Sequence, residues 1–183
     1  MTLIYSFPPI ADPQAEILIL GSMPGQASLD ANRYYAHPQN AFWRIMGELL
    51  GFDPAVASYA EKTHALKSAR IALWDVLQSC RRKGSLDSGI EHDSQCVNDF
   101  RLFFTQYKQI HQVFFNGAKA EACFRRDVLS KHIPGLQQIR LTRLPSTSPA
   151  HATLSFVQKR DQWQELLGSK LVLRRCSNSV LSA

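Results

Sequence analysis

Residues 17–25 read Ile17-Leu18-Ile19-Leu20-Gly21-Ser22-Met23-Pro24-Gly25, an apolar run that leads directly into a turn. A short apolar run is typical of a buried strand, and the glycines and proline that follow predict a tight turn. Because glycine has no side chain to block an approach, the turn brings backbone N–H groups close to a ligand. We therefore expect this strand and turn to form the floor of a pocket.

Two later segments have a composition that suits the same pocket. Residues 34–43 read Tyr-Tyr-Ala-His-Pro-Gln-Asn-Ala-Phe-Trp, and residues 144–151 read Leu-Pro-Ser-Thr-Ser-Pro-Ala-His. The first is rich in aromatic and amide side chains, and the second is a loop rich in hydroxyl groups and proline. Together with the turn after residue 20, they indicate a site for a flat, polar ring.

Apolar runs typical of strands alternate with helical periodicity along the chain, which predicts parallel strands joined by helical crossovers. The expected fold class is α/β with a central, mostly parallel, four-stranded sheet. The expected strands are Glu16–Leu20, Arg70–Leu77, Gln109–Phe115 and Leu136–Leu144.

Helical patterns lie between these strands. Apolar residues from Phe42 to Leu50 recur at helical spacing, with Asn40 able to cap the start and Gly51 at the end. Asp53 followed by Pro54 predicts the start of another helix. Further helical segments are expected at Phe100–Tyr107, Ala118–His132 and Leu154–Leu167.

The bulk composition limits the class of protein. With 183 residues, 45% of them hydrophobic, the chain is long enough for one well-packed domain, expected at 1–168, and 169–183 is expected to be a flexible basic tail. Lys+Arg of 21 against Asp+Glu of 15 gives a formal charge of +6. This excess suits a polyanionic partner without proving one.

The four cysteines, Cys80, Cys96, Cys123 and Cys176, form no C-x-x-C pair and have no histidine at zinc-ligand spacing. We interpret them as reduced thiols and expect neither a metal nor a cofactor. No secretory leader and no run of about 20 apolar residues is present, so a cytoplasmic protein without a membrane partner is expected.

Four polar segments follow the predicted strands. In an open parallel α/β sheet, ligands bind outside the carboxyl ends of the strands. The turn Gly21–Gly25, Asp75, the pair Asn116-Gly117 and the loop Pro145–His151 each lie at or just after such an end. The sequence therefore predicts that they converge on one crevice.

These motifs, in this order and spacing, resemble the uracil-DNA glycosylase superfamily over roughly residues 14 to 167. The segments involved are GSMPG, YYAHPQNAFW, LWDVL, FFNG and LPSTSPAHA. The resemblance is strongest to the mismatch-specific branch and, in GSMPG and LPSTSPAHA, to the hypoxanthine-DNA (deoxyinosine) glycosylases. It implies a three-layer αβα sandwich and excision of a deaminated base from DNA to leave an abasic site.

Asn40 is the candidate catalytic residue. In related glycosylases the position matching Ser22 or Met23 often carries an Asp, Asn or Glu that handles the attacking water, and neither residue here is one of these. The resemblance to the deoxyinosine branch makes Asn40 the substitute. An amide can orient water toward an oxocarbenium-like sugar, although Asn40 could also simply cap the following helix.

The candidate base-binding residues surround the predicted pocket. Tyr35 matches the aromatic residue on which the extruded base stacks in the resembling family, although packing in the core is the alternative. Asn116 either faces the pocket or makes the turn into a helix. The full base-binding set is Gly21, Ser22, Met23, Tyr35, Asp75 and Asn116.

Asp75 is the candidate for base selection. An ionised carboxylate accepts a hydrogen bond from N1–H of hypoxanthine and repels the unprotonated N1 of adenine. Uracil also carries a ring N–H and is not excluded by this argument. The alternative is that Asp75 satisfies loop amides at the end of its strand.

The late loop is the candidate DNA-binding segment. Its hydroxyls and amides suit phosphate, and its prolines stiffen a loop that could wedge into the gap left by a flipped nucleotide. Leu144 occupies the place where uracil-specific relatives carry a catalytic histidine. The expected DNA-binding residues are Gly25, Arg143, Pro145, Ser146, Ser148, Ala150 and His151.

The expected function is therefore a monomeric, monofunctional DNA glycosylase that removes hypoxanthine from damaged DNA. Three alternatives stay open at this point. They are a G:U/T mismatch glycosylase, a protein that binds damaged DNA without cutting it, and a hydrolase of free nucleosides.

Overall fold

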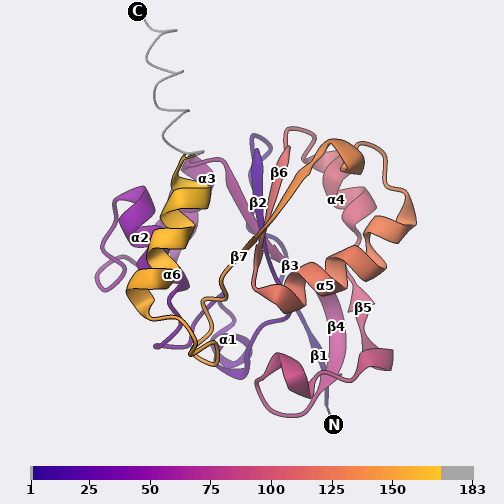
Figure 1. The fold of residues 1–183 in the computed structure, drawn as a ribbon, viewed down its shortest axis with the longest axis horizontal. Coiled ribbons are helices and arrows are strands. Elements are labelled where there is room, and N and C mark those ends of the chain that lie inside the picture. Colours follow the sequence, from indigo (N-terminus) through magenta and orange to yellow (C-terminus); the bar gives the residue numbers. More distant parts are fainter. Residues whose placement is uncertain (1, 170–183) are drawn as a thin grey trace, which may run out of the picture.

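The computed structural model describes residues 2–169, and it arranges them in three layers around a parallel sheet (Figure 1). The sheet has the strand order β3-β2-β6-β7. The expected α/β sandwich with a four-stranded parallel sheet is confirmed. Nearly all of the predicted tail, from residue 170 on, lies outside the described residues. The strands are β2 (Ile17–Gly21), β3 (Ile71–Asp75), β6 (Gln112–Asn116) and β7 (Arg140–Leu144).

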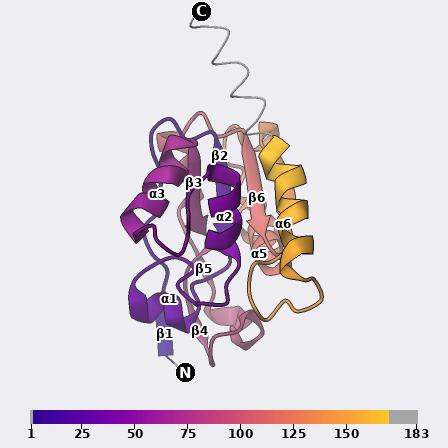
Figure 2. The ribbon, with the colours of Figure 1, turned by 90° about the vertical axis from the view of Figure 1, so that its left-hand side faces the viewer.

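Helices cover both faces of this sheet. Helices α2 (Phe42–Leu50), α3 (Tyr59–Ser68) and α6 (Phe156–Trp163) pack on one face, the one toward the viewer in Figure 2. Helices α4 (Phe100–Gln106) and α5 (Ala118–Asp127) cover the other face. Because β2 and β3 are buried on both faces, they are apolar along nearly their whole length.

A second, antiparallel sheet lies at the lower end of the molecule in both views, beside α1 (Gln26–Ala31). It has the order β1-β4-β5, from β1 (Thr2–Tyr5), β4 (Leu77–Arg82) and β5 (Cys96–Val97). The predicted single strand Arg70–Leu77 is therefore wrong at its end. The parallel strand stops at Asp75, and the chain then enters β4, in which buried and exposed residues partly alternate.

The helix predicted to start at Asp53 is also displaced. Asp53 caps only a turn, in which the Ala55 N–H donates to Asp53 Oδ1 at 2.8 Å. Helix α3 begins at Tyr59, because Ser58 and Glu61 form a capping box in which each side chain accepts from the other's backbone N–H.

Several other helices and strands are shorter than predicted. Strand β7 begins at Arg140, and β6 begins at Gln112. Helix α5 ends at Asp127, and α6 begins at Phe156 after the cap residue Ser155. The remaining elements are 3-10 turns at Asp87–Gly89, His92–Ser94, Leu129–Lys131 and Leu136–Gln138, and a π-helical turn at Gln164–Gly168.

Candidate active site

A cavity of about 620 Å³ opens at the carboxyl ends of the parallel strands. The register pairs Gly21 of β2 with Asp75 of β3, so the ends of these two strands lie side by side. The four segments predicted to converge all contribute to its wall. Of the residues predicted for the site, those lining it are Gly21, Ser22, Met23, Gly25, Tyr35, Asn40, Asp75, Asn116, Ser146, Ser148, Ala150 and His151.

Gly21 forms part of the floor, and the space around it admits no larger residue. A Cβ atom there would lie 2.3 Å from Asp75 Oδ1 and 3.0 Å from the Tyr35 hydroxyl oxygen. Both distances are too short for an undisturbed contact. Glycine is therefore required because Asp75 and Tyr35 close on this point of the backbone.

Asp75 is 3% exposed, and its Oδ2 atom has no hydrogen-bond partner within the described residues. Burial, followed by the nearby Asp87 carboxylate, raises the pKa of Asp75 to about 8, although the Arg82 guanidinium opposes the shift. The structure thus differs from the ionised carboxylate expected from the sequence. At neutral pH Asp75 is mainly a neutral acid with one O–H donor and one carbonyl acceptor.

Tyr35 adopts φ 53°, a backbone conformation uncommon for an aromatic residue. Its ring stacks on Phe42 with 4.1 Å between centroids, so one face is covered. Its hydroxyl is buried close to the Asn116 side chain. The unpartnered Oδ2 atom of Asp75 therefore lies on a residue of the same cavity wall, where a ligand could satisfy it.

The neighbouring Tyr34 belongs mainly to the core. It is 3% exposed, and its hydroxyl lies 3.2 Å from the carbonyl oxygens of Phe7 and Pro8. Its own backbone carbonyl accepts a hydrogen bond from the Trp43 indole at 2.9 Å. These contacts fix the segment that presents Tyr35 to the cavity.

Asn40 lines the cavity and also contacts the start of α2. The N-cap position is Ala41, one residue later than predicted, but the Phe42 N–H at the first turn still donates to Asn40 Oδ1 at 3.0 Å. The neighbouring Ala41 N–H donates to the carbonyl of Thr147 in the late loop. The helix contact and the loop together fix the position of the Asn40 side chain at the cavity wall.

Asn116 braces the late loop. Its Nδ2 donates to Thr147 Oγ1, and its Oδ1 accepts from the Thr147 N–H, both at 2.8 Å. Helix α6 holds the same loop, because Lys159 Nζ donates to the Ser148 carbonyl and Trp163 Nε1 donates to the Pro145 carbonyl. The loop is therefore fixed from both sides before any ligand binds.

Two predicted DNA-binding residues do not line the cavity. Pro145 is held by α6 through its carbonyl, and Arg143 forms an ion pair with Glu121 at 3.4 Å while staying half exposed. Arg82, although it lies in the basic run Arg81-Arg82-Lys83, is buried and donates through Nε to the Gly84 carbonyl.

One part of the cavity wall was not predicted from the sequence. Residues 85–88, Ser-Leu-Asp-Ser, extend from the hairpin after β4 and line the cavity. The Ser22 hydroxyl donates to Asp87 Oδ1 at 2.7 Å, which joins this segment to the first turn. The sequence after Gly84 is rich in serine, aspartate and glycine, which predicts a surface turn but does not indicate that the turn reaches the cavity.

The described residues contain no group of three or more histidine, cysteine or acidic side chains placed to hold a metal ion. Within residues 2–169, no helix has the length and apolar character needed to cross a bilayer.

The fold and the cavity define an α/β protein with a cavity at the carboxyl ends of its parallel strands, the place where open α/β sheets bind their ligands. Residues 8–167 match the family described as the Uracil DNA glycosylase superfamily. The chain therefore belongs to this superfamily.

Individual relatives agree with this assignment. Two proteins named "Hypoxanthine DNA glycosylase", from Methanosarcina barkeri and Methanosarcina acetivorans, are each 40% identical over 114 residues. The aligned part is 62% of this chain and 71% of each relative. The solution NMR structure of a "putative Uracil DNA glycosylase" from Methanosarcina acetivorans has a TM-score of 0.76 and 31% identity, and the match covers 93% of this chain and 99% of that one.

Proposed function

We propose that this protein is a monofunctional DNA glycosylase that flips hypoxanthine out of DNA and hydrolyses its N-glycosidic bond to leave an abasic site. One observation carries the proposal. Asn40 and Tyr35, from one segment, and Asp75, from the end of a distant strand, line one cavity beside a rigid loop. The names of the two curated relatives support hypoxanthine as the base.

The cleavage needs a water molecule held below the sugar and a place for the departing base. Asn40 is the candidate for holding the water, because an amide can orient it toward a sugar that already carries positive charge. Its oxygen accepts from the Phe42 N–H, and this contact fixes the orientation of the amide. The helix contact and the catalytic role therefore act together in one side chain.

The base would stack on the ring of Tyr35, with its polar edge toward the Asp75 carboxyl. The neutral carboxyl of Asp75 can accept from N1–H of hypoxanthine and donate to its O6 oxygen, which forms two hydrogen bonds on one edge. The same neutral carboxyl also fits the edge of adenine, with donor and acceptor exchanged. Selection against adenine should therefore strengthen as the pH rises toward 8 and Asp75 ionises.

The DNA backbone would lie across the late loop. Ser146 and Ser148 line the cavity, and the chain carries a formal charge of +6. Because Asn116, Lys159 and Trp163 already fix the loop, it can bind a distorted backbone without first becoming ordered.

Single-turnover cleavage of matched duplexes tests the proposal. The duplexes contain deoxyinosine, deoxyuridine, deoxyxanthosine or a thymine mismatch, and alkali then reveals abasic sites. Wild type is compared with Asn40→Ala and Asn40→Asp, and the exposed amide variant Gln106→Ala on α4 serves as the control.

The proposal predicts breaks at deoxyinosine only after alkali. Asn40→Ala should lose at least 100-fold in rate, Asn40→Asp should retain more because it keeps the helix contact, and the control should match wild type. Breaks confined to uracil or thymine mismatches would move the function to the mismatch-specific branch. Tight binding of damaged duplex without base release would favour a non-catalytic binder.

A further inference from the structure

The hydroxyl of Ser22 is committed to a contact with another residue of the cavity wall. Ser22 lines the cavity, and its Oγ donates to Asp87 Oδ1 at 2.7 Å. A serine hydroxyl has one proton to donate and two lone pairs that accept. Because Asp87 takes the proton, Ser22 can act toward the cavity only as an acceptor.

The proposed reaction requires such a group. A water molecule presents a lone pair to the sugar carbon when its own two protons are held by acceptors. The Asn40 oxygen already accepts from the Phe42 N–H and has one lone pair left for this purpose. A second acceptor from another part of the wall would hold the other proton of the water.

We propose that Asp87 is a positioning residue that fixes Ser22 as this second acceptor, so that Asn40 and Ser22 together hold the attacking water. This inference rests on the proposed glycosylase function. Ser22 is the catalytic residue of the pair, since it would touch the water, and Asp87 acts only through it.

The surroundings of Asp87 suit a carboxylate that holds a proton donor in place. Burial raises the pKa of Asp87, whereas the Ser22 hydrogen bond, Lys119 and Arg82 each lower it. The two cationic side chains offset part of the cost of burying the negative charge. Asp87 also opens a one-turn 3-10 helix, in which the Ile90 N–H donates to its carbonyl, so its backbone is held locally.

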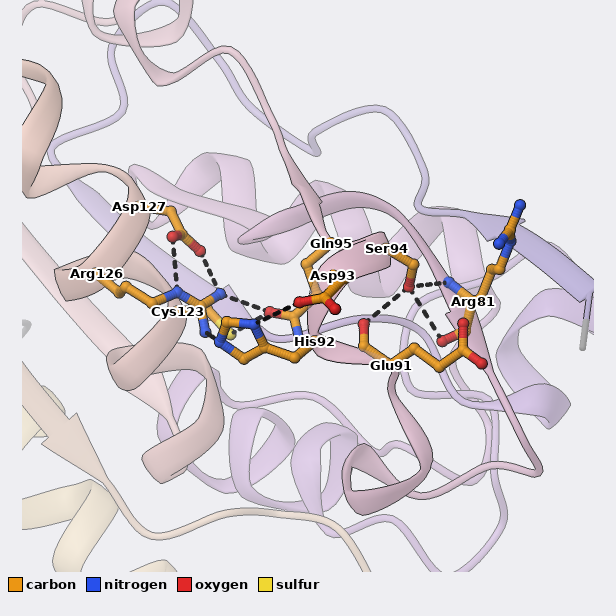
Figure 3. A network of polar contacts seen from close by, with 9 residues as sticks. All are labelled: Arg81, Glu91, His92, Asp93, Ser94, Gln95, Cys123, Arg126 and Asp127. Carbon is orange, nitrogen blue, oxygen red and sulfur yellow. Dashed lines mark hydrogen bonds and ion pairs between the residues drawn. The ribbon is translucent and has the colours of Figure 1, made fainter.

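The part of the hairpin that follows Asp87 is fixed from outside. Figure 3 shows a network on the far side of the hairpin, in which Arg126 of α5 contacts both Asp127 and Gln95. In the same network the Ser94 hydroxyl accepts from the Arg81 N–H and donates to the Glu91 carbonyl. Residues 91–95 of the hairpin, which follow the segment of Asp87, are thereby held against both α5 and β4.

A double-mutant cycle on the deoxyinosine duplex tests the inference. The variants are Ser22→Ala, Asp87→Ala, the double variant and Asp87→Asn, and the control is Asp93→Ala, whose side chain is fully exposed in the same hairpin. Each is measured for single-turnover rate, affinity for damaged duplex and thermal unfolding midpoint. Asn40→Ala is included as the reference for the proposed function.

Ser22→Ala and Asp87→Ala should each lower the rate by about 10-fold to 100-fold with affinity nearly unchanged, because only the water is misplaced. The double variant should be no slower than Ser22→Ala, since Asp87 acts through Ser22 alone. Asp87→Asn should recover most of the rate, because its amide oxygen can still accept the Ser22 proton. The control should match wild type.

Several results would overturn the inference. If Asp87→Ala lowers the rate further in the Ser22→Ala background, Asp87 acts independently of Ser22. If the loss differs between released bases, the pair reads the base and not the water. Unchanged rates in an active, Asn40-dependent enzyme would reject this inference alone, whereas an inactive wild type would reject the proposed function as well.

Discussion

The raised pKa of Asp75 makes the stability of the protein depend on pH in a way that one substitution should remove. Its pKa increases from the usual 3.8 to about 8, because the folded protein encloses the carboxyl. The unfolded chain releases this proton near pH 4, whereas the folded protein holds it until about pH 8. Asp75 therefore lowers the free energy of unfolding progressively between these pH values, and the loss levels off above pH 8.

The size of the effect follows from the shift. At about 1.4 kcal/mol per pKa unit, Asp75 costs the folded state about 2 kcal/mol at pH 5 and about 6 kcal/mol at pH 9. The wild type should therefore lose about 4 kcal/mol of unfolding free energy from Asp75 over this interval. Asn has nearly the same shape and does not ionise, so Asp75→Asn should lack this loss.

Urea unfolding at pH 5, 7 and 9 measures the difference directly. The free energy of unfolding of Asp75→Asn should exceed that of wild type by an amount that grows with pH. The exposed variant Asp93→Asn is the control, and its curve should run parallel to that of wild type. Parallel curves for wild type and Asp75→Asn would refute the assignment of a buried, neutral acid at this position.

Three further predictions concern the floor, the loop and the DNA contact. Gly21→Ala should lower the single-turnover rate at least 100-fold and reduce the midpoint of thermal unfolding, because the added Cβ would press on Asp75 Oδ1. Wild-type activity in this variant would contradict the described cavity floor. Lys159→Met keeps the aliphatic part of the side chain but loses the hydrogen bond to the Ser148 carbonyl. Its affinity for damaged duplex, measured by fluorescence anisotropy, should therefore fall several-fold. Unchanged affinity would argue against a loop held in place by α6. Affinity for duplex should also decrease steeply between 50 and 200 mM salt, by about one decade or more in total if phosphate contacts dominate, and a flat salt response would exclude them.

The parallel sheet could be predicted from the sequence because its strands are continuous apolar runs separated by helical periodicity. The second sheet could not be predicted as readily. Strand β4 follows β3 after only Val76, so the two read as one run, and nothing local marks the change of sheet. The start of α3 could have been predicted, because Ser58 and Glu61 have the spacing of a capping box. The pair Asp53-Pro54 is also typical of a helix start, and it pointed to an earlier position.

Most of the cavity wall could also be predicted, because residues after parallel strands must meet at one edge of the sheet. Asp87 was missed because it comes from the hairpin of the second sheet, which was itself not predicted. The protonation state of Asp75 was out of reach for a different reason. It depends on burial and on the Asp87 carboxylate, and neither is visible in the residues around position 75.

The identity of the released base tests the central claim most directly. Wild type and Asn40→Ala are incubated in excess over a deoxyinosine duplex, and the small molecules that are set free are identified by mass spectrometry. The account predicts free hypoxanthine in amounts equal to the abasic sites formed, with little from Asn40→Ala. Intact deoxyinosine DNA after incubation with wild type, although the duplex is bound, would contradict it.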